Sequence, residues 1–81
     1  MTDKQKSDIL NRHKDSEIAQ IDKRGKIEFV QLKSSKNGSP LVGVLYIVTP
    51  TMVSAVNYIE AAGICKKIGA KPIIPYISKG V

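Results

Sequence analysis

The chain has few of the features that mark membrane, secreted or disulfide-stabilised proteins. Its 81 residues include one cysteine, Cys65, one phenylalanine and no tryptophan. A single cysteine cannot form an intramolecular disulfide or a metal cage of several thiolates, and its apolar surroundings favour a packing role. No run of 18 apolar residues is present, and the N-terminus lacks the apolar stretch of a secretion signal. We therefore expect a cytoplasmic protein without membrane contact.

Acidic side chains are scarce in the second half of the sequence. The net charge is +6 at pH 7, and after Glu28 the only acidic residue is Glu60, whereas six lysines follow. A basic balance attracts polyanions such as DNA or RNA, and it contributes affinity through the release of counterions. Simple solubility is the alternative explanation, so charge by itself does not specify a function.

What is present fits one small domain over residues 1–81. A chain of this length buries only about 60% of the surface that its unfolded form exposes, so we expect one core. No internal repeat or low-complexity linker divides the sequence. Within residues 1–14, residues 3–13 predict a short charged helix that is marginal by itself and prone to fraying.

The middle of the chain predicts three strands. Residues 17–33 read EIAQID, then KRG, then KIEFVQLK, which is typical of two antiparallel strands joined by a turn in which Gly25 adopts a positive φ. Side chains alternate along a strand, so Gln31 and Lys33 share one face of the second. The turn-rich SSKNGSP is followed by LVGVLYIV, residues 41–48, a continuous apolar run expected of a buried strand.

The last third predicts a helix and then a strand. Thr49 can cap a helix with Pro50 in its first turn, and the helix over residues 51–68 is expected to end at Gly69. Residues 71–77, KPIIPYI, read as a strand whose second proline restricts it to an edge or a bulge. The predicted order is α-β-β-β-α-β in an α/β (α+β) fold with a mixed β-sheet.

The second face of this sheet is the reason to expect a homodimer. The helix over residues 51–68 can cover only one face, and residues 1–14 look too polar to cover the other well. An uncovered apolar face is commonly buried against a second copy of the chain.

A family resemblance begins at Glu17 and runs to Lys36, EIAQIDKRGKIEFVQLKSSK, where an acid on one strand is followed by a Gln-x-Lys pair on the next. This stretch resembles the core of the PD-(D/E)XK nuclease superfamily, in particular the archaeal Holliday-junction resolvases and related small nucleases. In these proteins an Asp precedes a strand and turn, and the next strand ends in Glu-x-Lys followed by Ser or Arg. The segment IEAAGICKKIGAKPIIPYI is similar to their second helix, glycine-containing turn and last strand. The resemblance covers about residues 15–78 and implies a restriction-endonuclease-like core.

The resemblance implies a metal-dependent endonuclease that hydrolyses branched or duplex DNA. Glu17 stands where the family has its metal-binding Asp, with Asp15 as the competing candidate. Gln31 takes the place of the second metal-binding carboxylate, and Lys33 that of the catalytic lysine. Mg²⁺, or Mn²⁺ in its place, prefers oxygen ligands and can activate a water molecule to attack a phosphodiester. The ammonium group of Lys33 could orient that water or stabilise the charge that develops on the phosphate.

Further side chains have donors that suit phosphate oxygens or a position near this site. The candidates for nucleic-acid binding are Ser34, Ser35, Lys36, Lys66, Lys67 and Lys71. Asn57 could be a polar residue directed toward the site from the second helix. His13 has no partner at a recognisable metal-ligand spacing, so we interpret it as a surface residue.

Other functions fit the same residues. Glu17 and Lys33 are ordinary solvated strand residues if the resemblance is set aside. A non-catalytic nucleic-acid-binding module is the second hypothesis, because Gln31 offers a neutral amide where the family has a carboxylate. A protein-interaction domain, motivated by the apolar LVGVLYIV segment, is the third.

Overall fold

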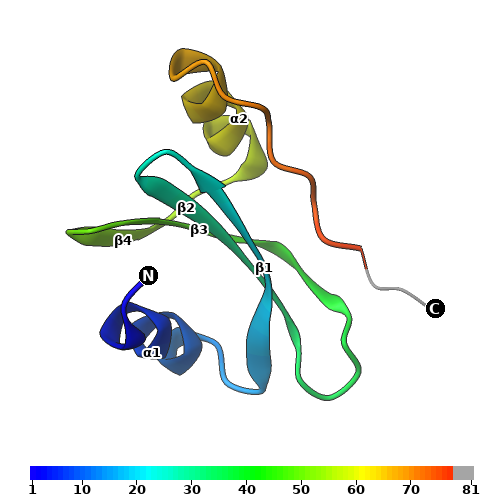
Figure 1. Cartoon of the computed structure of the whole chain (residues 1–81). Helices are drawn as coiled ribbons and strands as arrows, with labels where there is room; N and C mark the ends of the chain where they lie inside the picture. Colours follow the sequence, from blue (N-terminus) through cyan, green and yellow to red (C-terminus); the bar gives the residue numbers. More distant parts are fainter. Residues whose placement is uncertain (78–81) are drawn as a thin grey trace.

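The computed structural model describes residues 1–77, which form a helix, four strands and a second helix (Figure 1). The elements are α1 (Asp3–Arg12), β1 (Ser16–Arg24), β2 (Ile27–Ser34), β3 (Pro40–Thr49), β4 (Met52–Ala55) and α2 (Tyr58–Lys67). All strand pairs are antiparallel, and the spatial order is β1-β2-β3-β4. The α+β class is confirmed, whereas the sheet of the described residues is purely antiparallel rather than mixed.

The predicted hairpin of β1 and β2 is confirmed. Arg24 pairs with Ile27 across a turn in which Gly25 has φ 66°, a left-handed conformation that glycine adopts without steric cost. Near the open end of the hairpin, Glu17 pairs with Lys33. One register shift interrupts β1 between Ile18 and Gln20.

The sheet is covered on both faces because β2 and β3 alternate two sets of apolar side chains. One buried cluster joins the sheet to α2 and to the chain after it, and the other joins the opposite face to α1. The first contains Phe29, Leu45, Ile47, Ala61, Cys65 and Ile73, and the second contains Ile9, Val30, Leu32, Tyr46 and Val48. Cys65 is a free, buried thiol, as its setting in the sequence predicts.

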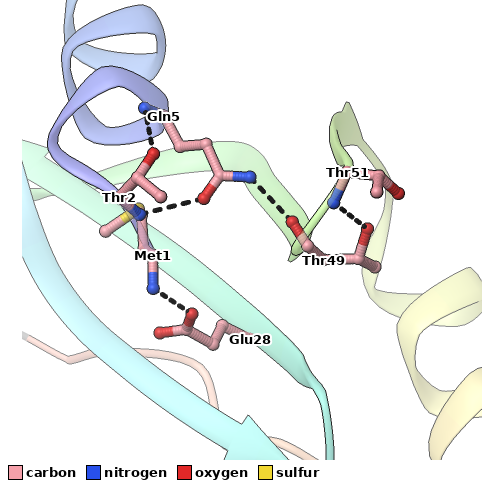
Figure 2. Close-up of polar contacts among 6 residues, drawn as sticks. All are labelled: Met1, Thr2, Gln5, Glu28, Thr49 and Thr51. Atoms are coloured by element: carbon pink, nitrogen blue, oxygen red, sulfur yellow. Dashed lines mark hydrogen bonds and ion pairs between the residues drawn. The ribbon is translucent and has the colours of Figure 1, made fainter.

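The first helix packs into the core, and the fraying expected of it stays a prediction. Ile9 is fully buried, and Thr2 and Gln5 form a capping box at the N-terminus of α1. The side-chain amide of Gln5 also donates to the carbonyl of Thr49 at 2.7 Å, which ties α1 to the end of β3 (Figure 2). Since α1 covers the second face, the reason given for a homodimer no longer holds, and the homodimer itself stays a prediction.

The helix predicted over residues 51–68 is wrong in its first half. The chain turns at Pro50 and forms the short strand β4, in which Val53 pairs with Val48. Proline at the second position of a tight turn and β-branched residues after it favour a hairpin, and these signals overrode the helix-start signal of the Thr-Pro pair. The end of α2 is confirmed, because Gly69 follows it with φ 71°.

The strand predicted over residues 71–77 is also wrong, so the fourth strand precedes α2 instead of following it. Proline at 72 and 75 removes two of the backbone donors that a ladder needs. The segment runs alongside the sheet in Figure 1 without joining it, and we name it the C-terminal strap, residues 71–77.

Candidate functional site

Glu17 and Lys33 lie together, on neighbouring strands. They are cross-strand partners of β1 and β2, and the Nζ atom of Lys33 is 3.5 Å from Oε1 of Glu17. Both side chains remain partly exposed, Lys33 at 29% and Glu17 at 54%. The antiparallel hairpin therefore brings the acid and the lysine of the family pattern to one place.

Asp15, the competing acid, is engaged elsewhere. Its carboxylate lies 3.6 Å from Nζ of Lys36, and its carbonyl accepts a hydrogen bond from the backbone N–H of Ser35. Asp15 has φ 60°, so it makes the tight connection between α1 and β1. The Ser34 hydroxyl accepts the backbone N–H of Lys36. These residues hold the β2–β3 turn, which their turn-forming composition predicts.

Gln31 is the most constrained of the predicted site residues. It is 2% exposed and is the only buried polar side chain among the described residues. Its amide oxygen accepts from the hydroxyl of Tyr58 and from the backbone N–H of Tyr76, both at 2.7 Å, and its Nε2 donates to the carbonyl of Ile74 at 2.9 Å. The side chain therefore fastens α2 and the C-terminal strap to the sheet.

These donors do not fit a divalent cation as they stand. An amide oxygen has two acceptor positions, and both of those on Gln31 are occupied. Glu17 is the only carboxylate paired beside Lys33, and residues 1–77 contain no group of three or more His, Cys, Asp or Glu side chains that could hold a metal ion. Mg²⁺ usually keeps one or two carboxylates among its ligands. A metal at this face would need Gln31 to release its partners.

The C-terminal strap covers the face that carries Gln31 and Lys33. The ammonium of Lys33 lies 5.9 Å from the centre of the Tyr76 ring, within the range of a cation–π contact. Gln20 on β1 donates to the carbonyl of Ile74 at 2.9 Å, the same carbonyl that Gln31 binds. Hydrogen bonds from the side-chain amides of Gln20 and Gln31 therefore attach the strap to the sheet, in place of the backbone hydrogen bonds of a fifth strand.

The predicted phosphate-binding residues separate into two groups. Ser34, Ser35 and Lys36 lie at the β2–β3 turn, whereas Lys66 and Lys67 are the last two residues of α2 and Lys71 follows the helix. Strand β2 runs between these ends, and its eight residues span about 23 Å at about 3.3 Å per step. The two groups cannot act as one small site.

Two lysines that sequence reasoning missed lie at the same end as Lys66, Lys67 and Lys71. Lys23 lies near the end of β1 and Lys26 in the β1–β2 turn, and both are exposed. We name these five lysines the basic end. The signal that could have found them is the KRGK sequence of the turn, because a tight turn presents its flanking side chains at the edge of a sheet.

Arg24 connects the two parts of the basic end. Its Nε donates to the carbonyl of Lys71 at 2.8 Å, and one Nη donates to the carbonyl of Pro72 at 3.4 Å. The other Nη donates to the carbonyl of Lys23 at 2.8 Å. Arg24 therefore holds the start of the strap against the β1–β2 turn.

His13 and Asn57 have structural partners. His13 is half-buried rather than a surface residue, because its Nε2 lies 2.5 Å from the hydroxyl of Tyr46. Asn57 caps α2, since its side-chain oxygen accepts the backbone N–H of Glu60 at 2.7 Å. The Asn57 side chain thus satisfies a backbone donor at the start of α2, whereas the His13 side chain pairs with a tyrosine of β3.

A groove of about 700 Å³ lies away from all of these residues, between α1 and the β3–β4 turn. Its walls include Lys4, Asp8 and Asn11 of α1 and Thr51 and Met52 of the hairpin. Figure 2 shows the contacts at its margin, where Thr49 accepts hydrogen bonds from Gln5 and from the backbone of Thr51. None of the sequence-predicted site residues lines this groove.

No helix within residues 1–77 is long and apolar enough to cross a membrane. No protein-family model matches the chain, and comparisons with curated proteins and with solved structures also find no match.

Proposed function

We propose that the protein binds DNA through its lysine side chains, as a domain that acts without a resident metal ion. The observation that carries this proposal is the separation of charges in the structure. Six of the seven carboxylates, all except Asp3, are engaged by neighbours, whereas the lysines of the basic end form no ion pair among residues 1–77. The engaged carboxylates are Asp8 with Arg12, Asp15 with Lys36, Glu17 with Lys33, Asp22 with Gln20, Glu28 with the N-terminal amine and Glu60 with Asn57.

Unpaired ammonium groups favour a polyanion for two reasons. They attract phosphates over several ångströms, and each phosphate that they neutralise releases condensed counterions into solution. A lysine that is already paired with a carboxylate contributes less binding free energy, because its contact with a phosphate replaces an existing ion pair. The net charge of +6 supplies the same attraction at longer range.

Metal-dependent cleavage is the second candidate. The observation that favours it is the Glu17–Lys33 pair, which reproduces the acid and lysine of the PD-(D/E)XK pattern at 3.5 Å. The occupied oxygen of Gln31 argues against it. Cleavage requires the C-terminal strap to leave that oxygen, so it would depend on an opening of the strap.

One assay separates the two candidates. Labelled linear duplex, single-stranded and four-way-junction DNA are incubated with the protein in Mg²⁺, in Mn²⁺ and in EDTA, and bound and cut species are read on the same gel. We expect binding in all three conditions, weaker at higher salt, with no cutting. Metal-dependent cutting that is lost in Lys33→Ala, with binding retained, would instead establish the nuclease. Absence of binding at low salt would overturn both candidates and favour a protein-interaction domain.

A further inference from the structure

We propose that the basic end, Lys23, Lys26, Lys66, Lys67 and Lys71, is the surface that contacts the phosphate backbone of DNA. This inference rests on the proposed function and adds where and how the contact is made. Sequence reasoning names only the last three of these lysines as candidates, and none of the metal-site residues that the resemblance implies belongs to the set. The surface therefore stands apart from the Glu17–Lys33 face.

Tertiary contacts bring the two halves of the basic end together. Ile27, the first residue of β2, packs against the cluster that contains Cys65 of α2. Figure 1 shows the β1–β2 turn at the end of the sheet nearest α2. The hydrogen bonds from Arg24 to the carbonyls of Lys71 and Pro72 hold this arrangement. Lysines from two segments that are 40 or more positions apart in the sequence thus lie at one end of the sheet.

The basic end is exposed, and the carboxylates beside it already have other partners. All five of its lysines are exposed. Two acids lie near the turn. Asp22 is half-buried and accepts a hydrogen bond from Gln20, and Glu28, the cross-strand partner of Lys23, is largely buried and bound by the N-terminal amine. A groove of about 400 Å³ runs beside the turn between Lys23 and Lys26 and the residues Met1, Gln5 and Pro50. An anion that approaches this end therefore meets cations with few acidic neighbours.

The opposite end of the hairpin offers a weaker surface. Lys36 is 3.6 Å from Asp15, and Lys33 is 3.5 Å from Glu17, so each ammonium already has a carboxylate beside it. Lys14 is the exposed cation there without an ion pair in the described structure. The field of the molecule is consequently stronger at the basic end.

The chemistry of the surface predicts contact with backbone phosphates and not with bases. Lysine is a flexible point charge that suits phosphate oxygens, whereas base reading depends mainly on planar or bidentate groups. Arg24 is the one guanidinium at this end, and all three of its nitrogens donate to backbone carbonyls. We therefore infer binding that depends on charge and salt but little on DNA sequence.

The test compares paired neutral substitutions that each remove two charges. The basic-end variants are Lys23→Gln with Lys26→Gln, and Lys66→Gln with Lys67→Gln, and the control is Lys14→Gln with Lys36→Gln at the opposite end. Binding to a labelled 20-base-pair duplex is measured by fluorescence anisotropy across a salt series, with a second duplex of different sequence. Circular dichroism and a thermal melt confirm that each variant is folded.

We expect each basic-end pair to weaken binding at least tenfold at 0.1 M salt and to reduce the slope of log K against log salt by about 1.8, since each phosphate contact contributes about 0.9. The control pair should change affinity less than threefold, and the two duplexes should bind alike. If the wild-type protein binds but only the control pair weakens it, the surface is wrong while the proposed function stands. If the wild-type protein does not bind at all, the proposed function itself fails.

Discussion

The hydroxyl of Tyr58 donates a hydrogen bond to the side-chain oxygen of Gln31 at 2.7 Å, and this contact joins the first residue of α2 to the middle of the sheet. The same oxygen accepts the backbone N–H of Tyr76, so one amide connects the sheet, a helix and the strap. A buried polar group is costly unless its partners are present, and here all of them are. These contacts give Gln31 a structural role that requires no catalytic one.

Replacement of Gln31 by leucine should destabilise the protein. The substitution fills a similar volume but leaves the hydroxyl of Tyr58 and the N–H of Tyr76 without their acceptor, and each unsatisfied buried group costs about 1–3 kcal/mol. We expect a loss of about 2–4 kcal/mol in the free energy of unfolding, measured by urea denaturation. Gln20→Leu is the matched control, because Gln20 is only half-buried, and its loss should be below about 1 kcal/mol. Equal losses would contradict the central role of Gln31.

Stability should fall at high pH through Tyr58. Burial raises the pKa of the Tyr58 hydroxyl above its ordinary value of 10.0, because desolvation disfavours the phenolate. The folded state thus holds this proton more tightly than the unfolded state, so the contribution is fully present below pH 10 and is lost as the pH rises above it. Ionisation would also remove the donor to Gln31. Urea denaturation at pH 8 and pH 11 should show a smaller loss for Tyr58→Phe than for the wild-type protein; the same loss in both would exclude Tyr58 as the source.

Truncation of Ile9 should test whether α1 belongs to the core. Ile9 is fully buried in the cluster with Val30 and Tyr46, so Ile9→Ala should cost about 2–4 kcal/mol through lost burial and a residual cavity. Leu10→Ala, at a half-buried position in the same turn of the helix, should cost less. Thermal or urea unfolding measures both. A negligible effect of Ile9→Ala would support the interpretation of a frayed N-terminal segment.

Arg24 should act as a positioning residue for the basic end. Arg24→Gln removes the donors that hold the carbonyls of Lys71 and Pro72, so the start of the strap should exchange its amide hydrogens faster. We expect this increase at residues 71–74 by hydrogen exchange and mass spectrometry, together with weaker binding to DNA. Arg24→Lys keeps the charge but cannot reproduce the three hydrogen bonds that the guanidinium donates to backbone carbonyls. If Arg24→Lys restores binding without restoring slow exchange, the charge of Arg24 matters for DNA and its positioning role does not.

Local patterns were sufficient where neighbouring residues decide the outcome. The hairpin of β1 and β2, the positive φ of Gly25 and the helix stop at Gly69 follow from turn chemistry and alternation within a few residues. The pairing of Glu17 with Lys33 follows from the same hairpin register. These predictions are confirmed because each depends on contacts close in sequence.

Residues 50–57 and 71–77 show where local patterns were insufficient. The Thr-Pro pair fits both a helix start and a tight turn, and pairing of β4 with β3 selected the turn. The strap has the composition of a strand, yet its two prolines and the available amides of Gln20 and Gln31 made side-chain bonds the better solution.

The sequence by itself determined a small, basic α+β domain with one hairpin that pairs an acid with a lysine, because charge, periodicity and turn residues act locally. The tertiary structure decided what Gln31 does and where the lysines gather. Gln31 joins the sheet to α2 and to the C-terminal strap because its side-chain oxygen accepts hydrogen bonds from Tyr58 and Tyr76, which lie 27 and 45 positions away in the sequence. The end of α2 lies at the β1–β2 end of the sheet because Ile27 packs against the cluster that contains Cys65 and Arg24 binds the carbonyl of Lys71. No short pattern encodes these long-range contacts.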